Sequence, residues 1–341
     1  MPDIRLALQQ AWLTKGLLAY LSWPVSLIYG WLIWLRKLLY RIGVFQSNRL
    51  PVPVIVVGNV FVGGVGKTPL VIALVKQLTA QGFKVGVLSR GFGRSSKGTQ
   101  FVTPQSMALE VGDEPLLIAR SCQVPVSVGK DRFQAGLDLL ARYPQTEVIV
   151  CDDGLQHLAL AHDVALCVFD ERGLGNGWVL PAGPLREPWY VDASDKSLIT
   201  VSTSSQAPQY PKTDFLVPRV LSHLAQQADG TTQTISTFRT QKVQALAGIG
   251  KPQAFFDMLL DLGISLTTTH ALADHDDLRT VDIDPAMGVV LCTEKDAVKL
   301  WNYLPTAWAV PLVTEIPPKL LAHILAGIEP KLSSAHGHQI T

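Results

Sequence analysis

The chain has 341 residues, of which 48% are hydrophobic, so it can bury a large core and is long enough for about two domains. Its formal net charge is +1 and its pI is near 7.7, which gives no sign of the basic surface that nucleic-acid binding needs. The four cysteines lie far apart, without C-x-x-C or metal-ligand spacing, so we expect them to be reduced thiols in a cytosolic setting.

An apolar segment lies near the start of the chain. Residues 16–35 include no charged side chain, and about 20 apolar residues are enough for a helix to cross a bilayer. Large apolar side chains recur there on one helical face: Trp12, Tyr20, Trp23, Leu27, Trp31 and Trp34. Aromatic residues along the whole length favour a helix that lies in the headgroup region; a spanning helix and a buried pair of core helices are the alternatives.

Two further features of this segment concern its shape and orientation. Pro24 lies in its middle and predicts a kinked or two-piece helix. The basic residues Arg36, Lys37, Arg41 and Arg49 follow the apolar run and favour the cytoplasmic side of a membrane. No small-residue cleavage site follows the run, which disfavours a cleaved signal peptide.

The run from 54 to 69, Val-Ile-Val-Val-Gly-Asn-Val-Phe-Val-Gly-Gly-Val-Gly-Lys-Thr-Pro, predicts a buried strand, a glycine-rich loop and the start of a helix. Backbone N–H groups at such a junction bind phosphate, with Lys67 reaching the β- and γ-phosphates and the Thr68 hydroxyl ligating Mg²⁺. The predicted nucleotide-binding residues are Phe61, Val62, Gly63, Gly64, Val65, Gly66, Lys67 and Thr68. The usual pattern has glycine where this chain has Phe61, and partitioning-type ATPases have a lysine where it has Val62.

Charged residues follow several later strands. Arg90 and Arg94 come after an apolar run at 85–89, and Arg132 follows another at 124–128. Because ligands bind at the carboxyl ends of strands in open α/β sheets, these arginines suit a phosphorylated substrate; solvated loop residues are the alternative. Asp113 lies before a helical segment, where it has either a functional role or only a helix-capping one.

Paired carboxylates, Asp152 and Asp153, end the strand-like run 147–151. In phosphate-loop proteins a carboxylate at such a place holds Mg²⁺ directly or through water. A further strand is predicted at 164–169, followed by an ordered glycine- and proline-rich loop that Arg186 and Glu187 close. ATP and Mg²⁺ are therefore the expected cofactors.

We predict an α/β fold: a phosphate-loop, mostly parallel sheet with flanking helices, an N-terminal membrane-associated helical segment and a second, smaller α/β domain. The expected division is listed in chain order: helical segment 1–45, nucleotide-binding domain 46–205, connector with a hairpin 206–241, second domain 242–332, and a frayed tail 333–341.

Seven motifs in order make the chain resemble the tetraacyldisaccharide 4′-kinase family of lipid A biosynthesis. They are Gly-Asn-x-x-x-Gly-Gly-x-Gly-Lys-Thr-Pro (58–69), Ser-Arg-Gly-Phe-Gly-Arg (89–94), Gly-Asp-Glu-Pro (112–115), Asp-Asp-Gly-Leu-Gln-His (152–157), Leu-Pro-Ala-Gly-Pro-Leu-Arg-Glu (180–187), Asp-His (274–275) and Thr-Glu-Lys-Asp-Ala-Val-Lys (293–299). The resemblance covers the chain from the N-terminal helix almost to its end. Within that family Phe61 is no departure, whereas tyrosine is the commoner residue at Phe92.

The resemblance implies ATP-dependent phosphorylation of the 4′-hydroxyl of a tetraacylated glucosamine disaccharide 1-phosphate. It implies that Asp113, oriented by His275, is the base. Lys67 is a further expected catalytic residue, because its charge neutralises the γ-phosphate. It also implies that Thr68, Asp152, Asp153 and Glu187 arrange Mg²⁺. The expected substrate-binding residues are listed together: Arg90, Arg94, Arg132 and Arg186.

The lipid substrate implies that the protein works at the cytoplasmic face of the inner membrane, held by a peripheral, monotopic or single-helix attachment. A membrane surface and the lipid are thus the expected partners, and nothing in the sequence indicates nucleic acid or an obligate protein partner.

The competing hypothesis is a membrane-associated ATPase or GTPase switch built on the same loop. A guanine reader has the pattern Asn-Lys-x-Asp, whereas Thr293-Glu-Lys-Asp296 places its lysine and aspartate side by side. Val62 also lacks the lysine of partitioning-type ATPases.

Overall fold

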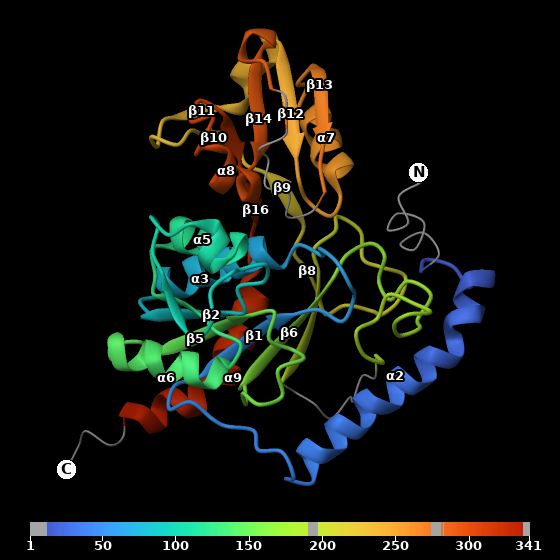
Figure 1. Cartoon of the computed structure of the whole chain (residues 1–341). Coiled ribbons are helices and arrows are strands. Elements are labelled where there is room, and N and C mark those ends of the chain that lie inside the picture. The colour runs from blue at the N-terminus through green and yellow to red at the C-terminus, as the bar shows by residue number, and fades with distance from the viewer. Residues whose placement is uncertain (1–11, 190–196, 274–280, 282, 337–341) are drawn as a thin grey trace.

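The computed structural model describes residues 12–189, 197–273, 281 and 283–336. Within these residues the chain forms an eight-stranded sheet, a six-stranded sheet and a two-stranded ladder between them. Figure 1 shows the six-stranded sheet above the larger one, with the long apolar helix α2 (Leu17–Arg41) along the side of the larger domain. The predicted fold class, a mostly parallel α/β sheet with a second smaller α/β domain, is confirmed.

The larger sheet has the strand order β3-β4-β2-β5-β1-β6-β7-β8. Its strands are β1 (Val54–Gly58), β2 (Val85–Ser89), β3 (Gln100–Val102), β4 (Val126–Val128), β5 (Val148–Asp152), β6 (Val164–Phe169), β7 (Leu198–Ser202) and β8 (Phe215–Leu216). Among these described strands, β3 pairs antiparallel with β4 and the other pairs are parallel. The parallel order brings the ends of β1 and β5 side by side, so the loop after β1 lies next to the carboxylates after β5.

Helices cover both faces of this sheet because the residues of its central strands are apolar on both sides. They are α3 (Lys67–Ala80), α4 (Ala108–Val111), α5 (Asp113–Cys122), α6 (Arg132–Arg142) and α9 (Pro318–His336). Ile55 and Val57 of β1 share a core cluster with residues of α3, α5 and α9, whereas Val54 and Val56 share another with Ala135 of α6. This alternation is what a doubly covered parallel strand requires.

The smaller sheet has the strand order β11-β10-β15-β14-β12-β13. Its strands are β10 (Leu224–Gln226), β11 (Thr232–Thr234), β12 (Val243–Ala247), β13 (Leu266–Ala271), β14 (Val289–Thr293) and β15 (Trp308–Val310). Helices α7 (Pro252–Asp261) and α8 (Glu294–Leu300) and the 3₁₀ helices Ile235–Thr240 and Pro285–Met287 complete this domain. The polar cluster at 274–277, which includes His275, lies outside the described residues.

The structure corrects the expected division of the chain. The hairpin of β10 and β11 belongs to the smaller sheet, and β8 belongs to the larger one, so the region 206–241 is no separate connector. The chain crosses between domains twice, through β9 (Arg219–Leu221) and β16 (Leu312–Thr314), which pair antiparallel. After β16 the chain returns to the larger domain, because the apolar face of α9 packs in the core cluster of the larger sheet.

Helix α9 also runs to His336 and so includes residues 333–336, which were expected to belong to a frayed tail; residues 337–341 lie outside the described part.

The apolar helix α2 is one uninterrupted helix that contains Pro24, so the predicted division into two pieces is not observed. A proline removes one backbone hydrogen bond of the helix. The helix can continue past the proline when the hydrogen bonds of the turns on either side remain intact. Leu17–Arg41 is long and apolar enough to cross a membrane by length and composition. Its large side chains are exposed, as Trp31 at 56% and Leu32 at 51% show, which excludes the alternative of a buried core helix.

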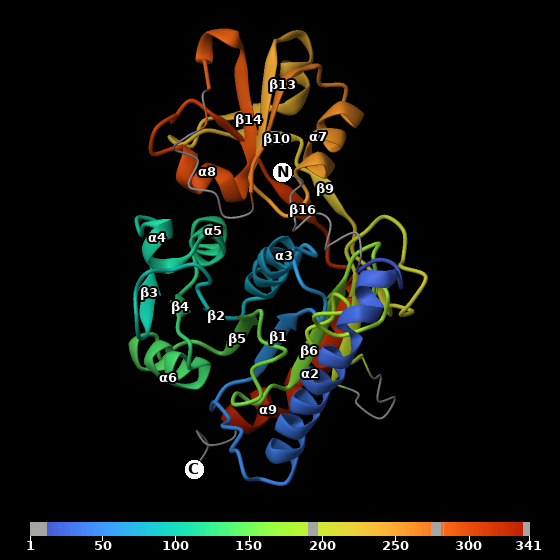
Figure 2. The same ribbon diagram turned by 45° about the vertical axis from the view of Figure 1, so that its right-hand side comes forward.

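The side of α2 that faces the protein carries small and polar residues. Ala19 and Ser26 are buried, and Ser26 Oγ donates to Val179 O at 2.9 Å while accepting from Ala182 N at 2.8 Å. Tyr29 Oη donates to Arg186 O at 2.9 Å. The amphipathic pattern is therefore inverted: polar contacts fix the helix to the domain, and large apolar side chains such as Leu21, Trp31 and Trp34 are exposed. Figure 2 shows α2 along the side of the larger domain.

The phosphate loop is held from one side by the segment 184–186. Val62 N donates to Pro184 O at 2.8 Å, and Arg186 N donates to Val60 O at 2.7 Å. Phe61 lies between these bonds with 3% exposure, and the Arg172 guanidinium carbon lies 4.2 Å from the centre of its ring. A buried, stacked side chain thus occupies the position where the usual pattern has glycine.

We expect charges on the outward side of α2 to weaken membrane binding. The double substitution Ile28→Asp with Leu32→Asp replaces two side chains exposed at 62% and 51%. Because an aspartate costs about 2.5–3.5 kcal/mol at the centre of a membrane helix, partitioning to anionic vesicles should fall by more than about tenfold. Leu109→Asp, at a site exposed at 66% on α4, is the control. Equal partitioning of the two variants in a flotation assay contradicts membrane attachment through this face.

A second prediction concerns Phe61. Replacing this buried ring by the smaller Ala should lower the free energy of unfolding by about 3–5 kcal/mol, because the cavity that it leaves cannot fully collapse. Phe61→Gly should lower it further by about 1 kcal/mol through backbone entropy. The exposed Phe92, replaced by Ala, should change it by less than about 0.5 kcal/mol. Guanidinium denaturation measures all three, and a stable glycine variant would show that the loop does not depend on the ring.

Candidate active site

One cavity of about 970 Å³ runs past the phosphate loop and is bounded by three parts of the fold. Residues 62–69 line it at the loop, and Tyr29, Arg36 and Lys37 line it from α2. Residues 249–251 and 293–295 of the smaller domain line it from above. The cavity therefore joins the apolar helix, the phosphate loop and the second domain in one space.

The loop has the backbone geometry of a phosphate cradle. Gly66 has φ of +82° and directly precedes α3, and this left-handed conformation favours glycine because a side chain would strain it. The N–H groups of the first turn of α3 have no partner within the helix and favour an anion. The predicted nucleotide-binding loop is thus formed as a turn between a strand and a helix.

Lys67 and the second carboxylate after β5 form an ion pair inside the cavity. Lys67 Nζ lies 3.1 Å from Asp153 Oδ1 and 2.8 Å from Asn59 Oδ1. Arg186 Nη1 lies 3.1 Å from Asp153 Oδ2. Burial acts to raise the pKa of Asp153, but Lys67 and Arg186 outweigh it and lower this pKa to about 2. Asp153 is therefore ionised at neutral pH and holds both cations beside the loop.

Asp152 differs from its neighbour because it is fully buried. Ser89 Oγ donates to its Oδ2 at 3.3 Å, and its Oδ1 has no hydrogen-bond partner among the described residues. Burial, followed by the charges of Glu114 and Asp153, raises the pKa of Asp152 to about 7. An unpaired, buried carboxylate oxygen beside a phosphate loop fits a cation or its water ligands.

The oxygen atoms available for a metal come from three segments. Thr68 lies in the first turn of α3, Asp152 ends β5, and Glu187 closes the loop after β6. Among the described residues no group of three His, Cys, Asp or Glu side chains is arranged to hold a metal ion by itself. Mg²⁺ sites in proteins are commonly built from one or two carboxylates together with phosphate oxygens and water.

The four arginines expected to bind substrate do not lie together. Arg90, Arg132 and Arg186 line the cavity, and Arg132 Nε is buried without a partner in the described structure. Arg94 instead donates to Val128 O at 3.2 Å and to Gly98 O at 2.6 Å and does not line the cavity. The structure therefore assigns Arg94 to the glycine-rich turn after β2, because backbone carbonyls already occupy its guanidinium.

The structure places Asp113 at the boundary between the domains. It is the first residue of α5, is 7% exposed, and its Oδ2 lies 2.9 Å from Lys299 Nζ of α8. Gly112 occupies the cap position, so Asp113 does not cap the helix with its side chain. Glu114 lines the cavity beside it. The expected orienting residue, His275, lies outside the described residues, so its relation to Asp113 stays a prediction.

Sequence reasoning missed residues that join α2 to the site. Lys37 forms an ion pair with Glu187, and Arg36 Nη2 donates to Gln156 O at 3.0 Å. Gln156 Nε2 in turn donates to Glu187 Oε1 at 2.8 Å. In the sequence, the basic residues after the apolar run indicated only on which side of a membrane they would lie. Their partners are more than 100 residues away along the chain, so no local pattern indicates the contacts.

His157 is the last residue of the motif that begins with Asp152 and Asp153. It lines the cavity, and its Nε2 is buried without a partner in the described structure. Burial, with Arg132 next, lowers the pKa of His157 to about 4. The imidazole is therefore neutral at neutral pH.

Comparisons with known proteins agree with this geometry. Residues 18–329 match the family described as tetraacyldisaccharide-1-P 4′-kinase. The chain is 47% identical over 330 residues to the tetraacyldisaccharide 4′-kinase of Acidovorax sp., covering 96% of each chain. It is 49% identical over 343 residues to that of Polaromonas naphthalenivorans, covering 98% of this chain and 99% of the relative.

A solved structure has the same fold. The crystal structure of LpxK from Aquifex aeolicus in complex with ATP has a TM-score of 0.79 and 30% sequence identity, covering 92% of this chain and 100% of that chain. The family resemblance seen in the seven motifs is confirmed over nearly the full length, and the chain belongs to the tetraacyldisaccharide 4′-kinase family.

Proposed function

We propose that this chain is an ATP-dependent kinase that phosphorylates the 4′-hydroxyl of a tetraacylated glucosamine disaccharide 1-phosphate in lipid A biosynthesis. Family membership supports this reaction. The observation that carries it is the continuity of one cavity from α2 to the phosphate loop, since a substrate with acyl chains has to reach the loop from a membrane.

The nucleotide binds at residues 61–68. Backbone N–H groups of the loop and the first turn of α3 bind the phosphates, and Lys67 leaves Asp153 to bind the β- and γ-phosphates. Arg186 remains with Asp153, so the carboxylate keeps a partner when Lys67 moves. A relative of this family has been solved in complex with ATP, which supports ATP as the nucleotide.

Mg²⁺ is the proposed metal, held by the Thr68 hydroxyl, the Asp152/Asp153 pair and Glu187. When bound it neutralises negative charge on the transferred phosphate. Asp152 Oδ1, which has no partner in the described structure, is available for the ion or for a water molecule on it. Lys37 and Gln156 hold Glu187 in place at the membrane-helix side of the cavity.

Asp113, oriented by His275, is the proposed base that accepts the proton of the 4′-hydroxyl as its oxygen attacks the γ-phosphorus. Its carboxylate pairs with Lys299 of α8 at the boundary between the domains. Lys67 stabilises the charge on the phosphate while ADP leaves. Arg90, Arg132 and Arg186 are the proposed groups that bind the anionic substrate, since they line the cavity and Arg94 does not.

The proposed location is the cytoplasmic face of the inner membrane, with attachment through α2. The exposed apolar side of that helix supports attachment. Arg36 and Lys37 lie at the end of α2 that reaches the cavity, as expected of basic residues at a cytoplasmic surface.

Incubation of the purified protein with γ-labelled ATP, Mg²⁺ and the disaccharide 1-phosphate lipid tests this function. We expect label in the lipid, on the 4′-oxygen. Label found only as free phosphate would instead support the membrane-associated ATPase or GTPase switch, which the family and its named relatives do not favour.

We predict that Asp113→Asn lowers the transfer rate by about 10²- to 10⁴-fold, because loss of a general base typically costs that much. The dissociation constant of ATP should change little, because Asp113 lies on α5 and not on the phosphate loop. Glu110→Gln, an exposed acid of the preceding helix, is the matched control.

Glu114→Gln separates the two carboxylates at the start of α5. A large loss of rate in Glu114→Gln together with a near-normal rate in Asp113→Asn would assign the base to Glu114. Asp113 would then only pair with Lys299.

A further inference from the structure

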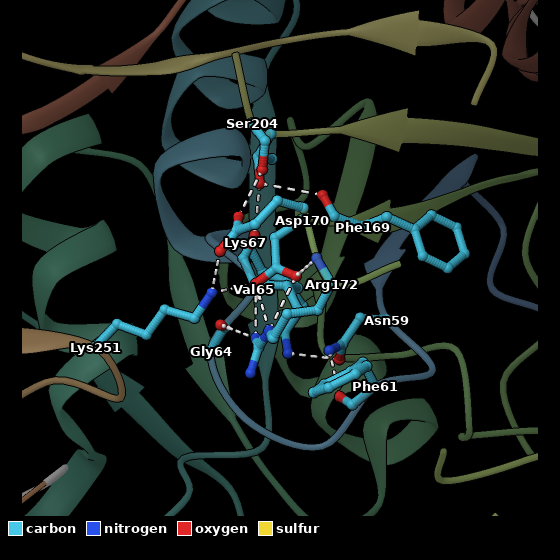
Figure 3. A network of polar contacts seen from close by, with 12 residues as sticks. Asn59, Phe61, Gly64, Val65, Lys67, Phe169, Asp170, Arg172, Ser204 and Lys251 are labelled. Atoms are coloured by element: carbon cyan, nitrogen blue, oxygen red, sulfur yellow. Dashed lines mark hydrogen bonds and ion pairs between the residues drawn. The ribbon is translucent and has the colours of Figure 1, made fainter. Parts of the chain in front are cut away.

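Lys251 brings a positive charge from the smaller domain to the phosphate loop. It lies between β12 and α7, and its ammonium group contacts two carboxylates of the larger domain (Figure 3). Its Nζ lies 3.3 Å from Asp170 Oδ2 and also forms an ion pair with Glu171 Oε1. Neither the family motifs nor the mechanism described above uses this lysine.

The contact lies directly beside the loop. A Cβ at Gly250 would lie 3.7 Å from the backbone nitrogen of Gly64, so the turn before Lys251 faces a backbone N–H of the phosphate loop. Lys251 also lines the same cavity as Gly64 and Lys67. The lysine can therefore reach a phosphate bound at the loop with a change of side-chain torsions.

Asp170 retains other partners without Lys251. Arg172 Nε and Nη2 donate to it at 2.9 and 2.6 Å, and Arg172 Nη2 also donates to Gly64 O at 2.9 Å. Removal of Lys251 therefore leaves Asp170 with a bidentate partner and leaves the loop supported by Arg172.

Glu171 also tolerates the loss of the lysine. Ser204 Oγ donates to its Oε2 at 2.8 Å, and 56% of its side chain is exposed, so water can solvate the carboxylate. Burial acts to raise the pKa of Glu171, but the hydrogen bond from Lys251 outweighs it and lowers this pKa to about 2. The carboxylate thus keeps its charge over the physiological range and attracts the lysine throughout.

We propose that Lys251 is a phosphate-binding residue of the nucleotide site. Asp170 and Glu171 hold its ammonium group in the nucleotide-free protein, and the group moves to a phosphate oxygen of ATP when the nucleotide binds. A lysine binds phosphate as a compact point charge through charge-assisted hydrogen bonds. Because Lys251 belongs to the smaller domain, this contact makes ATP hold the two domains together. The inference rests on nucleotide binding at the loop, as in the proposed function.

The test compares two substitutions that break the same ion pair. Lys251→Met removes the phosphate ligand and should raise the dissociation constant of ATP by about tenfold or more. Glu171→Gln removes the competing carboxylate and should lower that constant by about two- to fivefold. The double variant Lys251→Met with Glu171→Gln should bind ATP as weakly as Lys251→Met alone. Lys251→Arg keeps the positive charge and should retain most of the wild-type affinity for ATP.

Equilibrium binding of ATP and of AMP to the full-length protein in detergent is the measurement. AMP lacks the β- and γ-phosphates, so its dissociation constant should differ little between wild type and Lys251→Met. Lys97→Met, at an exposed position outside the cavity, controls for loss of a positive charge.

Three results would overturn the inference: unchanged ATP affinity in Lys251→Met, equal weakening of ATP and AMP binding, or a shift in the same direction in Lys251→Met and Glu171→Gln. The last result would mean that the pair only ties the domains together. A wild-type protein that binds ATP but does not label the lipid would overturn the kinase function and leave this inference standing.

Discussion

The backbone pairing of residues 60–62 with 184–186 is the constraint on which the active site depends. It fixes the phosphate loop to the segment that carries Arg186 and Glu187. Arg186 reaches Asp153 in the cavity, and its own carbonyl accepts from Tyr29 of α2. One short segment therefore supports both the proposed nucleotide-binding loop and the exposed apolar helix α2. Phosphoryl transfer needs donor and acceptor within a few tenths of an ångström of the productive geometry, and a shared rigid support supplies this.

The inverted polarity of α2 follows from the same requirement. A helix at the surface of a soluble protein buries its apolar side, whereas α2 turns Ala19, Ser26 and Tyr29 inward and leaves large apolar side chains such as Trp31 and Trp34 exposed. Small residues allow close approach, and serine and tyrosine hydroxyls fix the angle of the helix by hydrogen bonds to a loop. The outward side remains free to contact a membrane while the inward side keeps the helix in register with the cavity.

Local patterns in the sequence were sufficient for the parts of the site that depend on neighbouring residues. The strand, loop and helix around Lys67 and the carboxylates after β5 follow from hydrophobic periodicity and from the rule that ligands bind at strand ends. The role of Phe61 did not follow, because its ring depends on Arg172, which is distant in sequence. Arg94 had the expected position at a strand end, but backbone carbonyls of its own turn bind it.

The predicted division into domains was wrong because it placed α9 in the smaller domain. The apolar periodicity of α9 predicts a helix, but it does not show against which of the two sheets the helix packs. The smaller domain is inserted between β8 and α9, so the larger domain is completed by a helix that follows the smaller domain in the chain. During synthesis α2 is already available while one face of the larger sheet still lacks α9. The larger domain therefore cannot complete its core until the whole smaller domain has been synthesised.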